Sequence, residues 1–173
     1  MRETCCYEFL QASRYVEISP ELWRFAVDAT HHCTDTWQAV LAIMNFVHGY
    51  ITYQSFSTHV HTHGREALAQ RKGVCQDFAH VTIGMCRALK IPARYVSGYL
   101  ATETASATHA WMEVFIPGLG WRALDPTHNR QTNENYVKIA VGRDYADEPP
   151  VTGNYKGATE HKMDVRVSIK RSS

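Results

Sequence analysis

The hydrophobic pattern of this chain changes its period at Pro92. Before that residue, apolar side chains recur at the three- and four-residue spacing of core-facing helices, and after it β-branched and aromatic residues dominate and several segments alternate. Helices followed by strands indicate an α+β domain with an antiparallel β-sheet. The 173 residues, 45% of them hydrophobic, suffice for one packed core, so we expect a single domain over residues 1–173.

Helix signals fill the first half of the chain. Residues 19–21, Ser-Pro-Glu, supply an N-cap, a first-turn proline and an early acid for a first helix. Thr34 or Asp35 can cap a second helix, which we expect to end at Gly49. A brief third helix is expected over residues 65–71.

A fourth helix is expected from Cys75 to about Leu89, and its broad apolar face indicates a central position. Pro92 ends this helix and opens the strand-rich half. The stretch 147–157 is expected to be a surface connection. Five segments predict strands, and the last alternates most clearly: Ala93–Ala101, Ala107–Ile116, Trp121–Leu124, Tyr136–Val141 and Lys162–Lys170.

Cys75 lies between Gly73 and the fourth helix, which places its thiol at a helix N-terminus. Unpaired backbone N–H groups and the helix dipole favour an anion there, so this thiol should ionise more easily than that of a free cysteine. Such a thiol can act as a nucleophile in covalent catalysis. The plainer interpretation is a small buried apolar cysteine, and we assign a structural or incidental role to Cys5, Cys6, Cys33 and Cys86.

A cysteine nucleophile needs a base, and the base needs an orienting group. Among the ten histidines, His109 lies in a strand-like run where histidine has no propensity reason to be, and the next strand ends at Asp125. If Phe115 and Trp121 face each other across the hairpin, His109 and Asp125 share a face at a distance that a hydrogen bond can bridge. A register shift of one residue would separate them, and aspartate before proline is also a common turn residue.

Four segments resemble those of bacterial transglutaminase-like proteins, relatives of the papain-type cysteine enzymes: Gly-Val-Cys-Gln-Asp-Phe-Ala (73–79), Cys-Arg-Ala-Leu-Lys-Ile-Pro-Ala-Arg-Tyr-Val-Ser-Gly-Tyr (86–99), His-Ala-Trp-Met-Glu-Val (109–114) and Gly-Trp-Arg-Ala-Leu-Asp-Pro-Thr (120–127). The similarity continues through residues 141–147 and covers most of the chain after about residue 14. It implies a transglutaminase/papain-like fold, in which the nucleophile-bearing helix packs on the antiparallel sheet. It also implies a catalytic triad of Cys75, His109 and Asp125.

The resemblance implies an acyl-enzyme mechanism. Cys75 would attack a carboxamide or peptide carbon of a protein or peptide substrate, His109 would protonate the departing amine, and a thioester would remain. Water would then release an acid, as in a cysteine peptidase or amidase, whereas an amine would form a new amide, and the sequence leaves both open. The Cys75 backbone N–H is the expected first oxyanion donor, with Tyr53 and Gln54 as candidates for the second. No cofactor and no metal are expected.

Relatives of this kind commonly carry an N-terminal β-rich region ahead of the core. Residues 1–18 would then be a lead-in, the remnant of that region, with a β-prone piece at residues 14–18. Substrate selection would in that case depend on a part of the protein that precedes this sequence.

Composition limits the partners. The formal net charge is only +1 and no Lys/Arg run stands out, so neither nucleic acid nor an anionic membrane is expected. Five cysteines without a CxxC pair or framework spacing indicate a reducing compartment. Because no uncharged run approaches the roughly 20 residues of a membrane span, we expect a cytoplasmic protein.

Two other functions fit the sequence. His59, His61 and His63 alternate, so an extended chain would bring them to one face and they could bind the zinc of a metal-dependent hydrolase. No acidic ligand or general base accompanies them at a known metal spacing. The second alternative is a catalytically silent protein-binding domain of the same fold, although all three triad residues are present.

Overall fold

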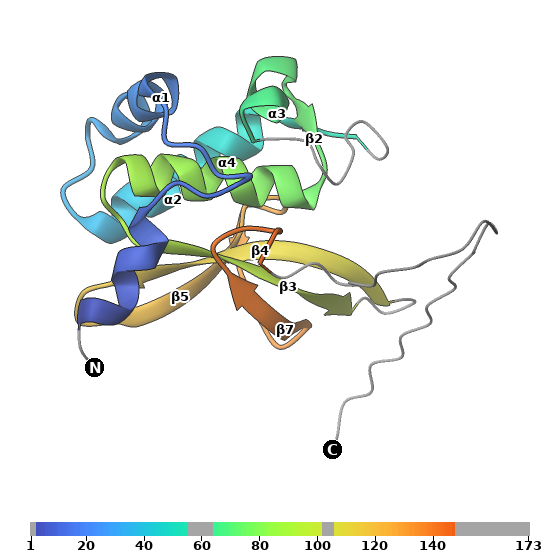
Figure 1. Ribbon diagram of the computed structural model, residues 1–173. Coiled ribbons are helices and arrows are strands. Elements are labelled where there is room, and N and C mark those ends of the chain that lie inside the picture. The colour runs from blue at the N-terminus through green and yellow to red at the C-terminus, as the bar shows by residue number, and fades with distance from the viewer. Residues whose placement is uncertain (1–2, 55–63, 102–105, 148–173) are drawn as a thin grey trace, which may run out of the picture.

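The computed structural model describes residues 3–54, 64–101 and 106–147. They form a layer of helices packed on an antiparallel sheet (Figure 1), which confirms the predicted α+β class. The helical elements are the 3-10 helix η1 (Glu3–Leu10) and the α-helices α1 (Pro20–Thr30), α2 (Thr36–Tyr50), α3 (Gly64–Gln70) and α4 (Cys75–Ala88). The strands are β1 (Thr52–Tyr53), β2 (Lys72–Gly73), β3 (Ala93–Ala101), β4 (Ser106–Ile116), β5 (Gly120–Asp125), β6 (Arg130–Gln131) and β7 (Tyr136–Gly142).

The main sheet has the strand order β6-β5-β4-β3-β7, and every neighbouring pair is antiparallel. Phe115 pairs with Trp121 across the β4–β5 hairpin, which is the register that puts His109 and Asp125 on one face. Gly118 and Gly120 take positive φ angles of 80° and 74° in the connecting turn, a conformation that glycine adopts without steric cost. The turn residues therefore fix which side chains of β4 and β5 share a face.

The helix starts follow the predicted caps. Asp35, not Thr34, caps α2, because its side chain accepts the backbone N–H of Gln38 at 2.8 Å. The predicted end at Gly49 is wrong, since the helix continues to Tyr50. The backbone N–H of Ile51 donates to the Val47 carbonyl oxygen at 3.0 Å and closes the last turn, in which the ring of Tyr50 packs 5.2 Å from that of Phe46.

Helix α4 lies between the other helices and the sheet (Figure 1), and it contacts α1, α2, α3, β3 and β4. Every residue from Gln76 to Ala88 is buried. The helix therefore supplies the centre of the core, as its apolar face predicted. Because the core encloses it on all sides, its first residue, Cys75, is held rigidly relative to the sheet.

The lead-in is packed as part of the domain, and its β-prone piece at residues 14–18 is not part of a strand. Tyr15 is buried, and its backbone N–H donates to the Asp144 carboxylate at 2.7 Å instead of to a neighbouring strand. The buried Arg87 guanidinium donates to the Gln11 carbonyl oxygen at 2.8 Å. These two bonds tie the lead-in to α4 and to the segment that follows β7.

Several expectations fall outside the described residues: the strand Lys162–Lys170, the connection at 147–157 apart from its first residue, and the triplet His59, His61 and His63. Among the helices that are described, none combines the length and apolar character needed to cross a membrane. The cytoplasmic location and the single domain over residues 1–173 stay predictions.

Candidate active site

Cys75 is the first residue of α4 and is partly exposed. Val74 precedes it as the N-cap in an extended conformation, and the Asp77 carboxylate accepts the Val74 backbone N–H at 2.8 Å. A Cβ on Gly73 would lie 2.9 Å from that carboxylate, so only glycine leaves room for this cap. The local sequence therefore forms a tight entry that presents the thiol at the helix N-terminus.

His109 of β4 lies beside Cys75, and both residues line the same two pockets. Its Nε2 lies 2.8 Å from Oδ2 of Asp125 at the end of β5, which leaves Nδ1 as the nitrogen available to the sulfur. Burial of His109 lowers its pKa, but its interactions with Asp125 and Cys75 outweigh this and raise the pKa to about 9. The imidazole is therefore charged at neutral pH.

Asp125 is fully buried and accepts more than the His109 hydrogen bond. Its Oδ2 also lies 2.6 Å from Nδ1 of His128 and accepts the Tyr136 hydroxyl at 2.6 Å. Its Oδ1 accepts the backbone N–H of Thr127 at 2.9 Å. Burial raises the pKa of this carboxyl, but its donors, His109 first among them, hold the pKa well below its usual range.

Sequence reasoning missed two of these partners. His128 lies three residues after Asp125 in the following turn, a spacing that could have indicated the contact. Tyr136 begins β7, three strand spacings from β5 in the sheet order, or roughly 14 Å in a flat sheet. Its hydroxyl donates to Asp125 although the two strands are not neighbours, and no local sequence pattern predicts this contact.

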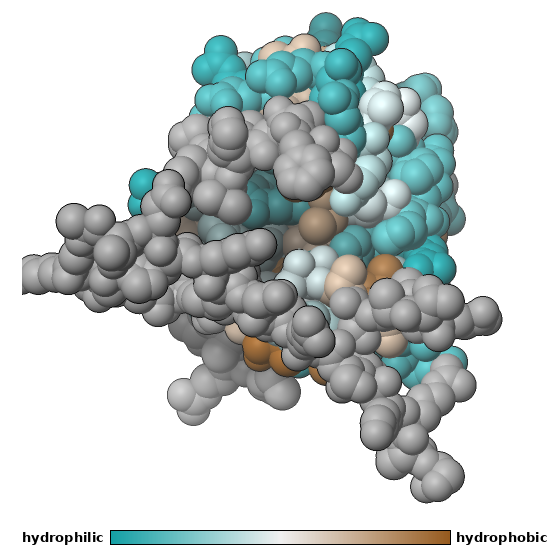
Figure 2. All heavy atoms as spheres, turned by 90° about the vertical axis from the view of Figure 1, so that its right-hand side faces the viewer, coloured by the Kyte–Doolittle hydropathy of each residue, from teal (hydrophilic) through white to brown (hydrophobic). Residues whose placement is uncertain are grey.

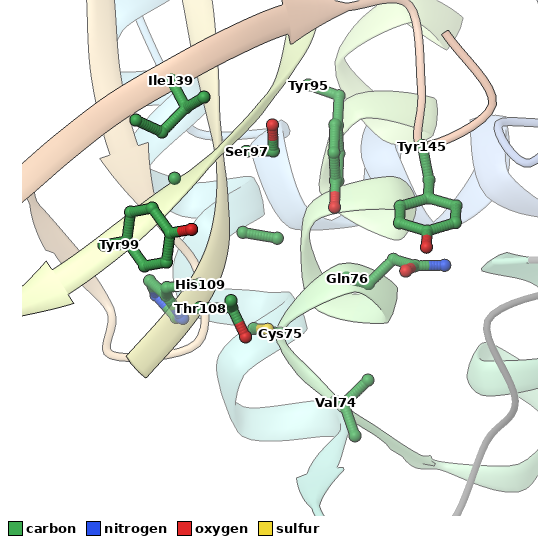
Figure 3. A pocket seen from close by; sticks show the side chains of 12 residues that line it. Val74, Cys75, Gln76, Tyr95, Ser97, Tyr99, Thr108, His109, Ile139 and Tyr145 are labelled. Carbon is green, nitrogen blue, oxygen red and sulfur yellow. The ribbon is translucent and has the colours of Figure 1, made fainter. Parts of the chain in front are cut away.

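Two pockets meet at the thiol and share Cys75, Thr108 and His109 among their lining residues. The first, of about 230 Å³, is walled mainly by aromatic and small side chains, including Tyr95, Tyr99 and Tyr145 (Figure 3). The second, of about 420 Å³, is lined by Tyr53, Leu100, Ala107, Thr127 and His128 in addition to the shared residues. A substrate that reaches the sulfur therefore has room on two sides.

The surface around these pockets differs in hydropathy between the helical side and the sheet side. Figure 2 looks onto the side of the molecule at which α4 begins, where the helical half is mostly hydrophilic and hydrophobic side chains gather over the sheet.

Trp111 is buried and its ring lies 6.2 Å from that of His109, so it shields one side of the imidazole.

The other residues singled out from the sequence differ in whether they reach the pockets. Tyr53 lines the second pocket beside Cys75, whereas Gln54 lines neither pocket, and its backbone N–H donates to the Gly73 carbonyl oxygen. Cys86 is fully buried, and burial raises the pKa of its thiol to about 12. Cys86 therefore stays protonated and has no access to a substrate.

Comparison with protein families gives a match over residues 24–126 to the transglutaminase-like superfamily. An uncharacterised protein of Mycobacterium leprae is 39% identical over 142 residues, which is 78% of this chain and 50% of that protein. A protein-glutamine gamma-glutamyltransferase of Pseudomonas aeruginosa is 37% identical over 102 residues, which is 50% of this chain and 15% of that protein. The chain thus spans half or less of the length of these curated relatives.

Solved structures share the fold. A Cytophaga hutchinsonii protein, classed provisionally as a cysteine protease, superposes with a TM-score of 0.77 at 36% identity, over 86% of this chain and 50% of that one. The periplasmic domain of TgpA from Pseudomonas aeruginosa gives a TM-score of 0.58 at 22% identity, over 75% of this chain and 49% of that one. The second likeness concerns the fold alone.

Proposed function

The chain belongs to the transglutaminase-like superfamily, and from that membership we propose that it is a thiol enzyme acting on carboxamide or peptide bonds through Cys75, His109 and Asp125. One observation carries this proposal: Cys75 and His109 line the same two pockets, and Nε2 of His109 lies 2.8 Å from Oδ2 of Asp125. The three residues come from α4, β4 and β5, which only the fold brings together.

In the acylation step, the Cys75 sulfur attacks the carbonyl carbon of the substrate. The backbone N–H of Cys75 stabilises the oxyanion that forms, because it lies at the positive end of α4. His109 then gives its Nδ1 proton to the departing amine, and the C–N bond breaks to leave a thioester. Asp125 stabilises the imidazolium and holds the ring in this orientation through Nε2.

In the deacylation step, His109 takes a proton at Nδ1 from water or from an amine, which attacks the thioester carbon and releases the sulfur. Water gives an acid, and an amine gives a new amide. The two pockets that meet at Cys75 support this scheme, because one can hold the acyl group while the other admits the departing or attacking amine.

Both outcomes are represented by name among similar proteins. The Cytophaga protein is provisionally classed with the cysteine proteases, and the Pseudomonas relative is named as a protein-glutamine gamma-glutamyltransferase. We therefore propose a protein or peptide as the substrate, with cleavage of a peptide bond, hydrolysis of a glutamine side chain, or acyl transfer as the reaction to be distinguished.

The decisive experiment incubates the protein with casein and with a glutamine-containing peptide, each with and without a primary amine, and analyses the products by mass spectrometry. Chain cleavage identifies a peptidase, loss of ammonia identifies an amidase, and incorporation of the amine identifies a transferase. The matched control is Cys75→Ala, which should abolish all three. If the native chain modifies neither substrate nor a library of peptides, the catalytically silent domain is favoured.

A further inference from the structure

A metal-ligand set lies behind His109, on the side of the ring away from Cys75. Within the described part of the chain, His109, Asp125 and His128 each offer one ligand atom, and these atoms lie within 4.8 Å of one another. Imidazole nitrogens and a carboxylate oxygen are ligands that zinc prefers. We propose that this cluster binds Zn²⁺ or a similar transition-metal dication, and that the bound ion stops turnover. Only the second part rests on the proposed function.

The three ligands already converge on one point. Nε2 of His109 lies 2.8 Å and Nδ1 of His128 lies 2.6 Å from the same atom, Oδ2 of Asp125. Tetrahedral zinc with bonds of about 2.1 Å holds neighbouring ligand atoms about 3.4 Å apart. The ion can therefore enter after small side-chain shifts. Each N–H···O bond is exchanged for a nitrogen–metal bond, and its proton leaves to solvent or to the other ring nitrogen.

The cluster is accessible from one side. The His128 side chain is 42% exposed, whereas those of His109 and Asp125 are 7% and 0% exposed. The pocket of about 420 Å³ is lined by both histidines, so an ion can approach through it. His128 can adjust its position, since it lies in the turn after β5 rather than in a strand.

A hydroxyl beside the cluster can bond to a water at the fourth position of the ion. Thr127 lines the same pocket, and within the described residues its Oγ1 is buried and makes no hydrogen bond. An unsatisfied buried polar atom in a native structure calls for an explanation. A water on the open position of the ion would supply the missing hydrogen bond.

A metal ion bound to Nε2 of His109 would block catalysis without contacting the Cys75 sulfur. His109 must alternate between a charged and a neutral ring to donate and accept a proton at Nδ1. With the metal on Nε2, the ring is held neutral, and loss of its remaining Nδ1 proton would create an imidazolate. The ion would also neutralise the Asp125 charge that stabilises the imidazolium.

A competing metal site uses Cys75 and Nδ1 of His109. The two ring nitrogens point in different directions, so one ion cannot reach both the thiolate and Asp125 with His109 between them. The two sites therefore respond oppositely to mutation. The proposed site depends on His128 and survives removal of Cys75. The competing site depends on Cys75 and survives removal of His128. Cobalt(II) also separates them, because a thiolate ligand adds an intense near-ultraviolet charge-transfer band.

The experiment measures Zn²⁺ binding by competition with a chromophoric chelator. The starting protein carries Cys75→Ala and glutamine at His59, His61 and His63, since that triplet could bind zinc itself. We expect one ion per chain and a zinc-dependent increase in Tm. Adding His128→Ala should weaken binding about 100-fold. The control, His32→Ala, removes an exposed histidine outside the cluster and should change nothing.

Several results would overturn the proposal: no zinc binding by the starting protein, equal affinity with and without His128, or a thiolate band when one equivalent of cobalt is added to the native chain. For the inhibitory part, zinc should inhibit amide turnover at the concentration at which it binds. Because the binding measurements use protein without Cys75, they remain decisive even if the chain proves to have no activity.

Discussion

Nε2 of His109 and Oδ2 of Asp125 lie 2.8 Å apart, across one diagonal of the β4–β5 hairpin. The carboxylate can hold the imidazole only because both side chains lie on the same face of the hairpin. The other donors to Asp125, from the turn after β5 and from β7, hold the carboxylate itself in place. The orientation of the proposed base thus depends on one buried charge.

The first prediction concerns the loss of the negative charge of Asp125. Asp125→Asn keeps the size of the side chain but removes the charge and one acceptor, so His109 loses its preferred orientation. We expect kcat to fall by about 10³- to 10⁴-fold, measured with the amide or peptide substrate that the native chain accepts. The control, Asp28→Asn, alters an exposed carboxylate in a 3.8 Å surface pair with Arg24 and should leave kcat unchanged. A loss smaller than 10-fold for Asp125→Asn would contradict the assignment.

Tyr136 is predicted to act as a positioning residue. Tyr136→Phe keeps the ring packed 5.4 Å from that of Trp111 and removes only the hydroxyl that donates to Asp125. We expect kcat to fall about 10-fold with little change in KM, and the free energy of unfolding to fall by about 1 kcal/mol. Tyr7→Phe, at a tyrosine that is 67% exposed, is the control. A loss of stability with unchanged kcat would show that the hydroxyl is merely structural.

The pKa of His109 predicts a pH dependence. Because that pKa is raised in the folded chain, from 6.5 to about 9, its contribution to stability is fully present below pH 6.5 and is lost as the pH rises through about 9. The contribution amounts to at most about 3 kcal/mol. The difference in unfolding free energy between the native chain and His109→Gln should therefore shrink from neutral to alkaline pH. A difference that stays constant or grows over this range would be inconsistent with a charged imidazole.

Gly98 pairs with His109 across β3 and β4, and it is predicted to be irreplaceable. A Cβ there would lie 2.6 Å from the Trp111 ring and still closer to the Val137 carbonyl oxygen. Gly98→Ala should cost at least about 2 kcal/mol in chemical denaturation, because backbone on the neighbouring strand must move. Gly49→Ala, where no atom of the described residues outside the neighbouring helix backbone lies within 4 Å of the new Cβ, should instead stabilise α2 by about 0.5–1 kcal/mol. Equal effects of the two substitutions would contradict this packing.

The sequence was sufficient where local signals determine structure. The caps at Ser19 and Asp35 predict the helix starts, and the turn residues 117–120 predict a hairpin, one register of which brings His109 to Asp125. The position of Cys75 at a helix start likewise marks it as the candidate nucleophile. These features depend on residues a few positions apart. The resemblance to the transglutaminase-like proteins then joins the three residues into one triad.

The sequence was insufficient where distant segments meet. Tyr136 reaches Asp125 although their strands are not neighbours in the sheet, and the lead-in is held by Asp144, 129 positions away from Tyr15. Residues 14–18 are β-prone by residue type, but the backbone N–H of the buried Tyr15 donates to a side chain rather than to a neighbouring strand. A long-range side-chain contact leaves no periodic signal.

The proposed function requires Cys75 to be an activated nucleophile, and its reaction with iodoacetamide at mildly acidic pH is the most direct test. We predict stoichiometric labelling of Cys75 at a rate well above that of a free thiol, located by peptide mass spectrometry. Labelling should disappear in Cys75→Ala, while the buried Cys86 stays unlabelled in both proteins. A Cys75 that reacts no faster than a free thiol would contradict its role as the nucleophile.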